Sequence, residues 1–383
     1  MVYSRLVFAA AETVVMKKPP ALKGRTDPVF GLLAQAPHKA RLADYLALLK
    51  PLDERGRYLP FAELRYRWAP GWDAPLCWAL VKKARAAQFV RLLALGEPAQ
   101  LANFVMTPTA QKAITAVDRH ATTAALDYMA KQIGEHAHLS YLLADLIEDE
   151  AISSSQLEGA ATTTPVAKDM LRRQRLPRTP DERMVIGNYK MMSFAWEKRH
   201  EPLSVELIAA MHRVGVEGID DEQYSPGIFR FNDEVVVQDG EGNTVHTPPP
   251  AEGVSLRLQA LAKWINQLQH DPDQAGYLHP LIQAIALHFA VGYEHPFRDG
   301  NGRVARALFY WVMFKHDYSG FRYITISTLL RNAPVKYGRS YLNSEADGLD
   351  LTYFIDFQSS IIARAVSGFT GAFMEASLLA RAG

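Results

Sequence analysis

Cysteine is nearly absent from this 383-residue chain, and Cys77 is its one thiol. A single cysteine excludes an intramolecular disulfide framework and fits a reducing compartment. The neighbouring Leu76 and Trp78 predict that this thiol is buried rather than a nucleophile. The small disulfide-stapled folds of secreted proteins are therefore excluded.

Long apolar runs and an excess of charge of one sign are also missing. No run reaches the roughly 18–20 apolar residues of a membrane span, and the net charge is +1. This balance gives no general attraction to membranes or nucleic acids. Residues 6–11 are apolar, but lysines follow them instead of preceding them, which is not the order of a signal peptide. We expect a cytoplasmic protein with neither membrane nor nucleic acid as its partner.

Helical periodicity dominates what is present. Apolar residues recur at helical spacing in several segments, and residues 76–155 are mostly helix-compatible, with a break at Thr107-Pro108. One good strand signal occurs, Val235–Val237 and Thr244–Thr247 around a Gly-rich turn, which predicts a β-hairpin. The predicted fold class is mainly α, with this short hairpin and a mostly helical N-terminal extension. The segments predicted as helices are residues 41–50, 185–199, 203–215 and 274–294.

Three tryptophans, Trp68, Trp72 and Trp78, lie close together in a segment that also contains Pro70 and Pro75. This spacing favours a packed aromatic cluster under loops. An aromatic-lined ligand site is the alternative interpretation.

Residues 295–306 read His-Pro-Phe-Arg-Asp-Gly-Asn-Gly-Arg-Val-Ala-Arg. The segment combines a potential base (His295), a carboxylate suited to a hard metal ion (Asp299), a Gly-Asn-Gly turn and two arginines (Arg303, Arg306). Phosphates bind to backbone N–H groups at a helix start, to guanidinium groups and to Mg²⁺ held by a carboxylate. These are the parts needed to hold a nucleoside triphosphate and transfer a piece of it. The same residues could also form a plain turn between helices, with solvated arginines.

This segment resembles the motif H-x-F-x-(D/E)-G-N-G-R-x-x-R of Fic domains at every fixed position. The resemblance implies that His295 is the general base that activates a protein hydroxyl, and that Asp299 is a ligand of Mg²⁺. It also implies phosphate binding by the backbone of Gly300, Asn301 and Gly302, by Arg303 at the α and β phosphates, and by Arg306 at the γ phosphate.

Two positions refine the resemblance. The related phosphate-transferring Doc toxins typically carry lysine where this chain has Gly302, so glycine favours attack at the α-phosphate and nucleotidyl transfer. Fic domains usually have an apolar residue before the histidine, whereas this chain has Glu294. That carboxylate would either face solvent or raise the basicity of His295.

Two further segments are similar to parts of Fic proteins. The predicted hairpin at residues 232–247 lies where they carry a flap that pairs with an extended segment of the target. Upstream, Ser154, Glu158 and Gly159 match the pattern (S/T)-x-x-x-E-(G/N) of an inhibitory helix. Ser154 and Glu158 share a helix face, and Gly159 can end the helix. The resemblance implies that Glu158 pairs with Arg306 and opposes the γ phosphate.

We expect an N-terminal extension over residues 1–120, of undefined role, and a Fic domain over residues 121–383. The Fic domain would contain the inhibitory helix at about residues 146–159, the flap at 232–247 and the active-site loop at 295–306.

The resemblance predicts a protein adenylyltransferase that uses ATP and Mg²⁺ to attach AMP to a Ser, Thr or Tyr hydroxyl, restrained by Glu158. The target would dock on the flap, and the chain itself is one candidate target. Removal of AMP and another nucleotide or diphosphate donor stay open. So does a non-catalytic regulatory or toxin–antitoxin module, although the intact His295 argues against it. Homodimerisation is one expected trigger for release of the inhibitory helix.

Overall fold

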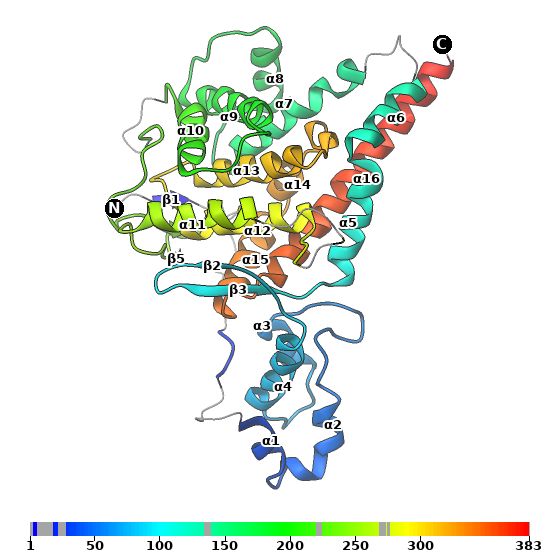
Figure 1. The fold of residues 1–383 in the computed structure, drawn as a ribbon, viewed down its shortest axis with the longest axis vertical. Coiled ribbons are helices and arrows are strands. Elements are labelled where there is room, and N and C mark those ends of the chain that lie inside the picture. The colour runs from blue at the N-terminus through cyan, green and yellow to red at the C-terminus, as the bar shows by residue number, and fades with distance from the viewer. Residues whose placement is uncertain are drawn as a thin grey trace.

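The computed structural model describes residues 3–5, 18–21, 28–133, 139–219, 224–267, 273 and 276–382. Helices predominate throughout this part of the chain (Figure 1), in agreement with the predicted fold class. In these residues no helix combines the length and the apolar character needed to cross a membrane. The apolar segment at residues 6–11 lies outside the described residues.

Two buried helices, α12 (Pro280–Glu294) and α13 (Asn301–Lys315), pack against each other at the centre of the fold. Both are buried around almost their whole circumference, which is the pattern of a helix enclosed by others. The enclosing helices, which Figure 1 places around this pair, are α9 (Pro180–Glu197), α10 (Val205–Val216), α11 (Val254–Gln267), α15 (Pro334–Ala346) and α16 (Thr352–Ala382).

Helix α7 (Leu139–Leu157) lies against α9 and against the short helix α14 (Ser327–Arg331). Gly159, with φ of 96°, follows the end of α7 in the left-handed conformation that glycine adopts without strain. Helix α8 (Thr164–Arg172) then leads to α9, while α5 (Pro108–His120) runs beside α16, and α6 (Thr123–Ile133) continues that layer (Figure 1).

The predicted flap hairpin is present but short, with strands β4 (Val236–Gln238) and β5 (Thr244–His246). Its second edge is occupied, because β1 (Tyr3–Arg5) pairs with β4 in parallel. The outer edge of β4 is thus covered by a segment from the N-terminal end of the described chain.

The prediction of a single hairpin is wrong. Strands β2 (Val90–Leu95) and β3 (Gln100–Phe104) form a second antiparallel hairpin inside the segment interpreted as helix-compatible. Leucine, alanine and arginine dominate β2, and these residues favour helices in isolation. Contacts of β2 with α11 and α12 decide its conformation instead.

Two helix predictions were too long. The helix expected at residues 274–294 begins at Pro280, where His279 caps the first turn by accepting from Leu281 N at 3.1 Å. A proline at the first helical position suits such a start, because its missing N–H is not needed there. The helix expected at residues 41–50 is the single turn α2 (Leu42–Leu46), preceded by the 3₁₀ turn His38–Arg41.

The N-terminal lobe contains α1 (Pro28–Leu33), α2, α3 (Phe61–Leu64) and α4 (Ala74–Ala86) below the β2–β3 hairpin in Figure 1. Trp78 is buried, and Phe61 packs between it and Trp68. Trp72 packs against Tyr45 in a neighbouring cluster, so the predicted aromatic cluster is present. Cys77 is fully buried, as predicted, and burial raises the pKa of its thiol to about 12.

Candidate active site

His295 is the residue that ends α12, and its backbone takes the left-handed conformation with φ of 46°. A non-glycine residue seldom adopts this conformation, so the surrounding structure has to hold it there. Arg230 does so from the segment before the flap: its Nε donates to His295 O at 2.9 Å, and its backbone N donates to Pro296 O at 2.8 Å. The buried guanidinium of Arg230 therefore fixes the turn that aims the imidazole.

The protonation state of His295 follows from its surroundings. Burial, assisted by the charges of His246 and Arg230, lowers its pKa to about 3, so the ring is neutral at physiological pH. Nδ1 lies 3.3 Å from Gly292 O and donates to it. The proton is thus on Nδ1, and the Nε2 lone pair is buried without a partner in the described part of the chain. Such a nitrogen is available to accept a proton from a bound hydroxyl.

The loop after His295 is braced by its own side chains. Asn301 accepts from Phe297 N and donates to Phe297 O, both at 2.8 Å, which closes the turn. Phe297 is buried and stacks on His212 of α10, with ring centroids 3.8 Å apart. His212 in turn donates from Nε2 to Asp299 O at 3.0 Å and accepts from Gly227 N at Nδ1. The side chain of Asn301 is therefore a brace for the loop.

Both motif arginines are buried on α13 with N–H groups left over. Arg303 donates from Nη1 to Gly215 O at 3.1 Å, and its guanidinium lies 5.3 Å from the centre of the Tyr224 ring. Arg303 Nε and Nη2, and Arg306 Nη1, are buried without a partner among the described residues. Buried cationic donors without acceptors are costly, and an anionic ligand would satisfy them.

Asp299 is half-buried beside the arginines, and its carboxylate accepts from Gly300 N at 2.5 Å. Burial raises its pKa, and the Arg303 guanidinium opposes this shift. Among the described residues no three or more His, Cys, Asp or Glu side chains gather as a metal site. One carboxylate beside a phosphate site matches the way Mg²⁺ is held, because phosphate oxygens and water supply its other ligands.

Glu158 reaches into the same site from the end of α7. Its Oε1 accepts from Arg306 Nη2 at 2.7 Å, and Ser154 accepts from the same guanidinium at Oγ (2.8 Å) and at its carbonyl oxygen (3.1 Å). A Cβ added to Gly302 would collide with the Glu158 carboxylate. The space beside Gly302 and one face of Arg306 are thus filled by Glu158.

The cavity enclosed by these groups has a volume of only about 60 Å³, whereas ligand pockets typically measure roughly 300–1,000 Å³. Its other walls come from the flap, α12 and α15. They include His246, whose ring nitrogens lie 2.9 Å from Glu345 Oε2 and 2.8 Å from Tyr293 O. A nucleotide could enter only if part of this lining, such as the Glu158 side chain, moved.

Glu294 neither faces solvent nor raises the basicity of His295, the two alternatives that the sequence left open. The residue is buried, pairs with Arg257 Nε of α11 at 2.7 Å, and accepts from Gly96 N at 2.7 Å. It also does not contribute to the pKa shift of His295. Its contacts connect α11, α12 and the turn of the β2–β3 hairpin.

The structure brings together His295, the Gly300–Arg306 segment, Ser154 and Glu158, and it places Asp299 close enough to Arg303 and Glu158 for their charges to act on its pKa. Sequence reasoning missed His212 and Arg230, which orient the loop. One signal for His212 was available: it lies four residues after Ile208 on the apolar face of α10, where a polar side chain needs specific partners.

Residues 202–313 match the family model described as the Fic/DOC family. The chain contains a Fic domain. The matched residues include the flap, the complete active-site loop and most of α13. Helix α7, which carries Ser154, and the adjoining Glu158 lie outside the match.

Curated relatives of the Fic domain cover a limited part of the chain. A protein adenylyltransferase Fic of Nematostella vectensis is 32% identical over 124 residues, which is 32% of this chain and 26% of the relative. A protein of the same name from Drosophila grimshawi is 33% identical over 73 residues, or 19% of this chain and 14% of the relative. The chain thus spans about a quarter or less of the length of these relatives.

Solved structures are similar over a larger part. A Fic family protein from Desulfovibrio desulfuricans G20 matches with a TM-score of 0.53 and 20% identity, covering 70% of this chain and 75% of that one. A Fic domain containing signaling protein from Bacteroides thetaiotaomicron VPI-5482 matches with a TM-score of 0.53 and 19% identity, covering 66% and 97%. At this identity the likeness shows the fold, which is the helical Fic fold.

Proposed function

We propose that the chain is a protein adenylyltransferase that moves AMP from ATP to a Ser, Thr or Tyr hydroxyl of a protein, and that Glu158 restrains it. The observation that carries the proposal is His295 Nε2, which has no partner among the described residues and lies in the same small cavity as Arg306. N–H groups of Arg303 and Arg306 nearby also have no acceptor in the described part of the chain. A neutral base beside buried guanidinium donors matches the needs of phosphoryl chemistry. The curated relatives described above are named protein adenylyltransferases, which supports the same activity.

In the proposed reaction the target hydroxyl gives its proton to His295 Nε2, and its oxygen forms a bond to the α-phosphorus of ATP. The bond from that phosphorus to the α,β-bridging oxygen breaks, and pyrophosphate leaves. Arg303 and the backbone N–H groups of the loop would stabilise the charge on the phosphates. Asp299 would hold Mg²⁺, which supplies further positive charge at the phosphate oxygens when bound.

The proposed restraint acts at Arg306. The Glu158 carboxylate takes the guanidinium donors that the γ phosphate would use, and its charge repels a phosphate placed there. ATP would then bind weakly or in an unproductive position. The small volume of the cavity supports this account, because the side chain of Glu158 forms part of its wall.

The β4 edge of the flap supports the chain itself as one target. An extended segment that pairs with the flap is the expected binding mode of a target, and residues Tyr3–Arg5 already pair with β4. Two hydroxyl-bearing residues, Tyr3 and Ser4, lie in that strand. We propose that this segment competes with other targets for the flap and is itself modified.

The test uses ATP labelled at the α or at the γ phosphate. We expect the Glu158→Gly protein with Mg²⁺ to incorporate α label and no γ label, and the Glu158→Gly/His295→Ala protein to incorporate neither. Peptide mass mapping of the labelled chain would locate the modified hydroxyl. Incorporation of γ label would show that the protein transfers phosphate instead of AMP. Incorporation of α label by the His295→Ala variant would show that His295 is not the base.

A further inference from the structure

A second and larger cavity lies in the N-terminal lobe, away from the Fic motif. Its volume is about 420 Å³, within the range of small-molecule sites. The segment between α2 and α3 forms most of its wall, and the 3₁₀ turn Arg65–Arg67 and α4 close the remainder. Nothing in the Fic motif or in the matched residues 202–313 accounts for this cavity.

The charges that line this cavity are unbalanced. Five cationic side chains face two acidic ones, although the whole chain is nearly neutral. The acidic residues are Asp53 and Glu54, and the cationic ones are Lys50, Arg55, Arg57, Arg67 and Arg85.

Asp53 is already saturated by its neighbours. Its carboxylate accepts from Arg57 Nε at 2.9 Å and Nη2 at 2.7 Å, from Arg67 Nη1 at 3.4 Å, and from the backbone N of Arg55 and of Arg57, both at 2.9 Å. One carboxylate therefore serves two guanidinium groups, and the hydrogen bond to Arg67 is long. The other acid, Glu54, is exposed at the rim and pairs with Lys50.

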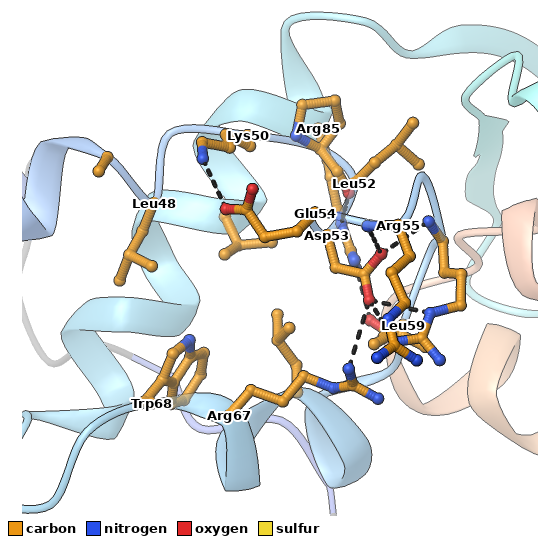
Figure 2. A pocket seen from close by; sticks show the side chains of 15 residues that line it. Leu48, Lys50, Leu52, Asp53, Glu54, Arg55, Leu59, Arg67, Trp68 and Arg85 are labelled. Atoms are coloured by element: carbon orange, nitrogen blue, oxygen red, sulfur yellow. Dashed lines mark hydrogen bonds and ion pairs between the residues drawn. The ribbon is translucent and has the colours of Figure 1, made fainter.

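The opposite wall is apolar. Figure 2 shows Leu48 and Trp68 on one side of the pocket, with Asp53 and Arg55 on the other. Trp68 is half-buried and packs partly on Phe61, so one part of its indole remains beside the cavity. An aromatic and aliphatic wall facing guanidinium groups suits a ligand with an apolar ring at one end and an anionic group at the other.

We propose that this cavity is a binding site for a small aromatic anion, a phosphate ester or a carboxylate, distinct from the nucleotide site of the Fic domain. The anionic group accepts hydrogen bonds from the guanidinium groups of Arg55 and Arg67. For Arg67 this replaces the long hydrogen bond to Asp53. The ring lies against Trp68 and Leu48. The proposal is independent of the function proposed for the Fic domain.

The inner wall of the cavity is connected to the Fic domain. Arg85 of α4 is buried and donates to Pro51 O and Leu59 O, which belong to the cavity segment. Its Nη1 also donates to Tyr353 Oη of α16 at 2.8 Å. A ligand that shifts the cavity segment therefore acts on residues bonded to α16.

The test is calorimetric titration of the full chain with three probes of the same ring: 1-naphthyl phosphate, 1-naphthoate and 1-naphthol. We expect one equivalent of an anionic probe to bind, and the neutral naphthol to bind at least about tenfold more weakly, since it cannot form charge-assisted hydrogen bonds. The ratio between phosphate and carboxylate probes identifies the preferred anion. Equal affinity for naphthol and the anions, or no binding of either anion, overturns the proposal.

Variants locate the bound probe. Arg67→Gln and Arg55→Gln, both on exposed side chains, should each weaken the anionic probe about tenfold. Arg173→Gln, an exposed arginine on the surface after α8, is the matched control and should change nothing. Loss of binding in Arg303→Gln with unchanged binding in both cavity variants would assign the probe to the Fic site and overturn the proposal. Thermal unfolding of each variant checks that it is folded.

Discussion

Glu294 shows how much a single residue can differ from what its position in a motif suggests. It directly precedes the proposed base, yet its carboxylate points away to Arg257 and to the backbone of Gly96. The pair with Arg257 is almost fully buried, with exposures of 13% for Arg257 and 2% for Glu294. Removing one partner of such a pair leaves a buried charge without compensation, which is strongly destabilising.

We predict that Glu294→Ala lowers the free energy of unfolding by about 3 kcal/mol, because Arg257 and the Gly96 N–H both lose their acceptor. Chemical denaturation measures the loss. The matched control is Glu201→Ala, which removes a pair with Lys198 that is largely exposed, and should cost no more than about 1 kcal/mol. Equal losses in the two variants would contradict the structural role of Glu294.

At the scale of elements, the C-terminal half of α7 is connected to α14 by polar contacts. Glu150 accepts from Ile326 N at 3.0 Å and from Ser327 N at 2.9 Å, and so satisfies donors at the start of α14. Ser153 shares a hydrogen bond with Thr328. These contacts hold the helix from which Glu158 reaches Arg306.

We predict that Glu150→Gln loosens α7 and raises AMP incorporation part of the way toward the level of Glu158→Gly, because the charge-assisted bonds to α14 are weakened. Hydrogen exchange of the α7 amides and label incorporation are the two measurements. Asp149→Asn is the control, since Asp149 pairs with Lys168 of α8 and makes no contact with α14 that the structure records. Faster hydrogen exchange without any gain in AMP incorporation would show that the α7–α14 contacts do not contribute to the restraint by Glu158.

The elements also show where sequence reasoning succeeds and where it fails. The active-site loop could be predicted because its residues are contiguous in the sequence. A histidine, a carboxylate, a Gly-Asn-Gly turn and two arginines seldom occur together outside a phosphate-binding site. The β2–β3 hairpin could not, because Val90–Leu95 contains helix-forming residues and becomes a strand through tertiary contacts. The supports of the loop, His212 and Arg230, come from distant segments. The apolar face of α10 indicates that His212 needs a partner, but it does not indicate which group that partner is.

At the scale of the whole molecule, several histidines are buried as neutral groups. Burial lowers the pKa of His212 and of His295 to about 3, and it lowers the pKa of His288 well below the usual value. The unfolded chain binds these protons near pH 6.5, so below that pH the unfolded state binds more protons than the native state. The contribution of these neutral histidines to the free energy of unfolding is complete above pH 6.5 and is lost as the pH falls toward 3. Burial raises the pKa of Asp356 to about 6. Below that pH the native state binds this proton more tightly than the unfolded state, so Asp356 adds to the free energy of unfolding as the pH falls.

We predict that the free energy of unfolding falls steeply between pH 6.5 and 4.5. His212, His279, His288 and His295 favour proton uptake on unfolding. Asp299, Asp347 and Asp356, whose pKa burial raises, oppose it. The net uptake is at least about one proton, which corresponds to roughly 1.4 kcal/mol per pH unit. Urea denaturation at a series of pH values measures the slope. A stability that is flat over this interval would mean that these histidines are charged in the native state.

The central claim is that the carboxylate of Glu158 restrains a complete transferase site by holding Arg306. The measurement is the initial rate of AMP incorporation by the wild type, Glu158→Gln and Glu158→Gly at equal ATP and Mg²⁺. We expect both variants to be at least about tenfold faster than the wild type. Glu158→Gln removes the negative charge that repels the γ phosphate, and Glu158→Gly removes the whole side chain from the Arg306 guanidinium. Equal rates in the three proteins would contradict the claim.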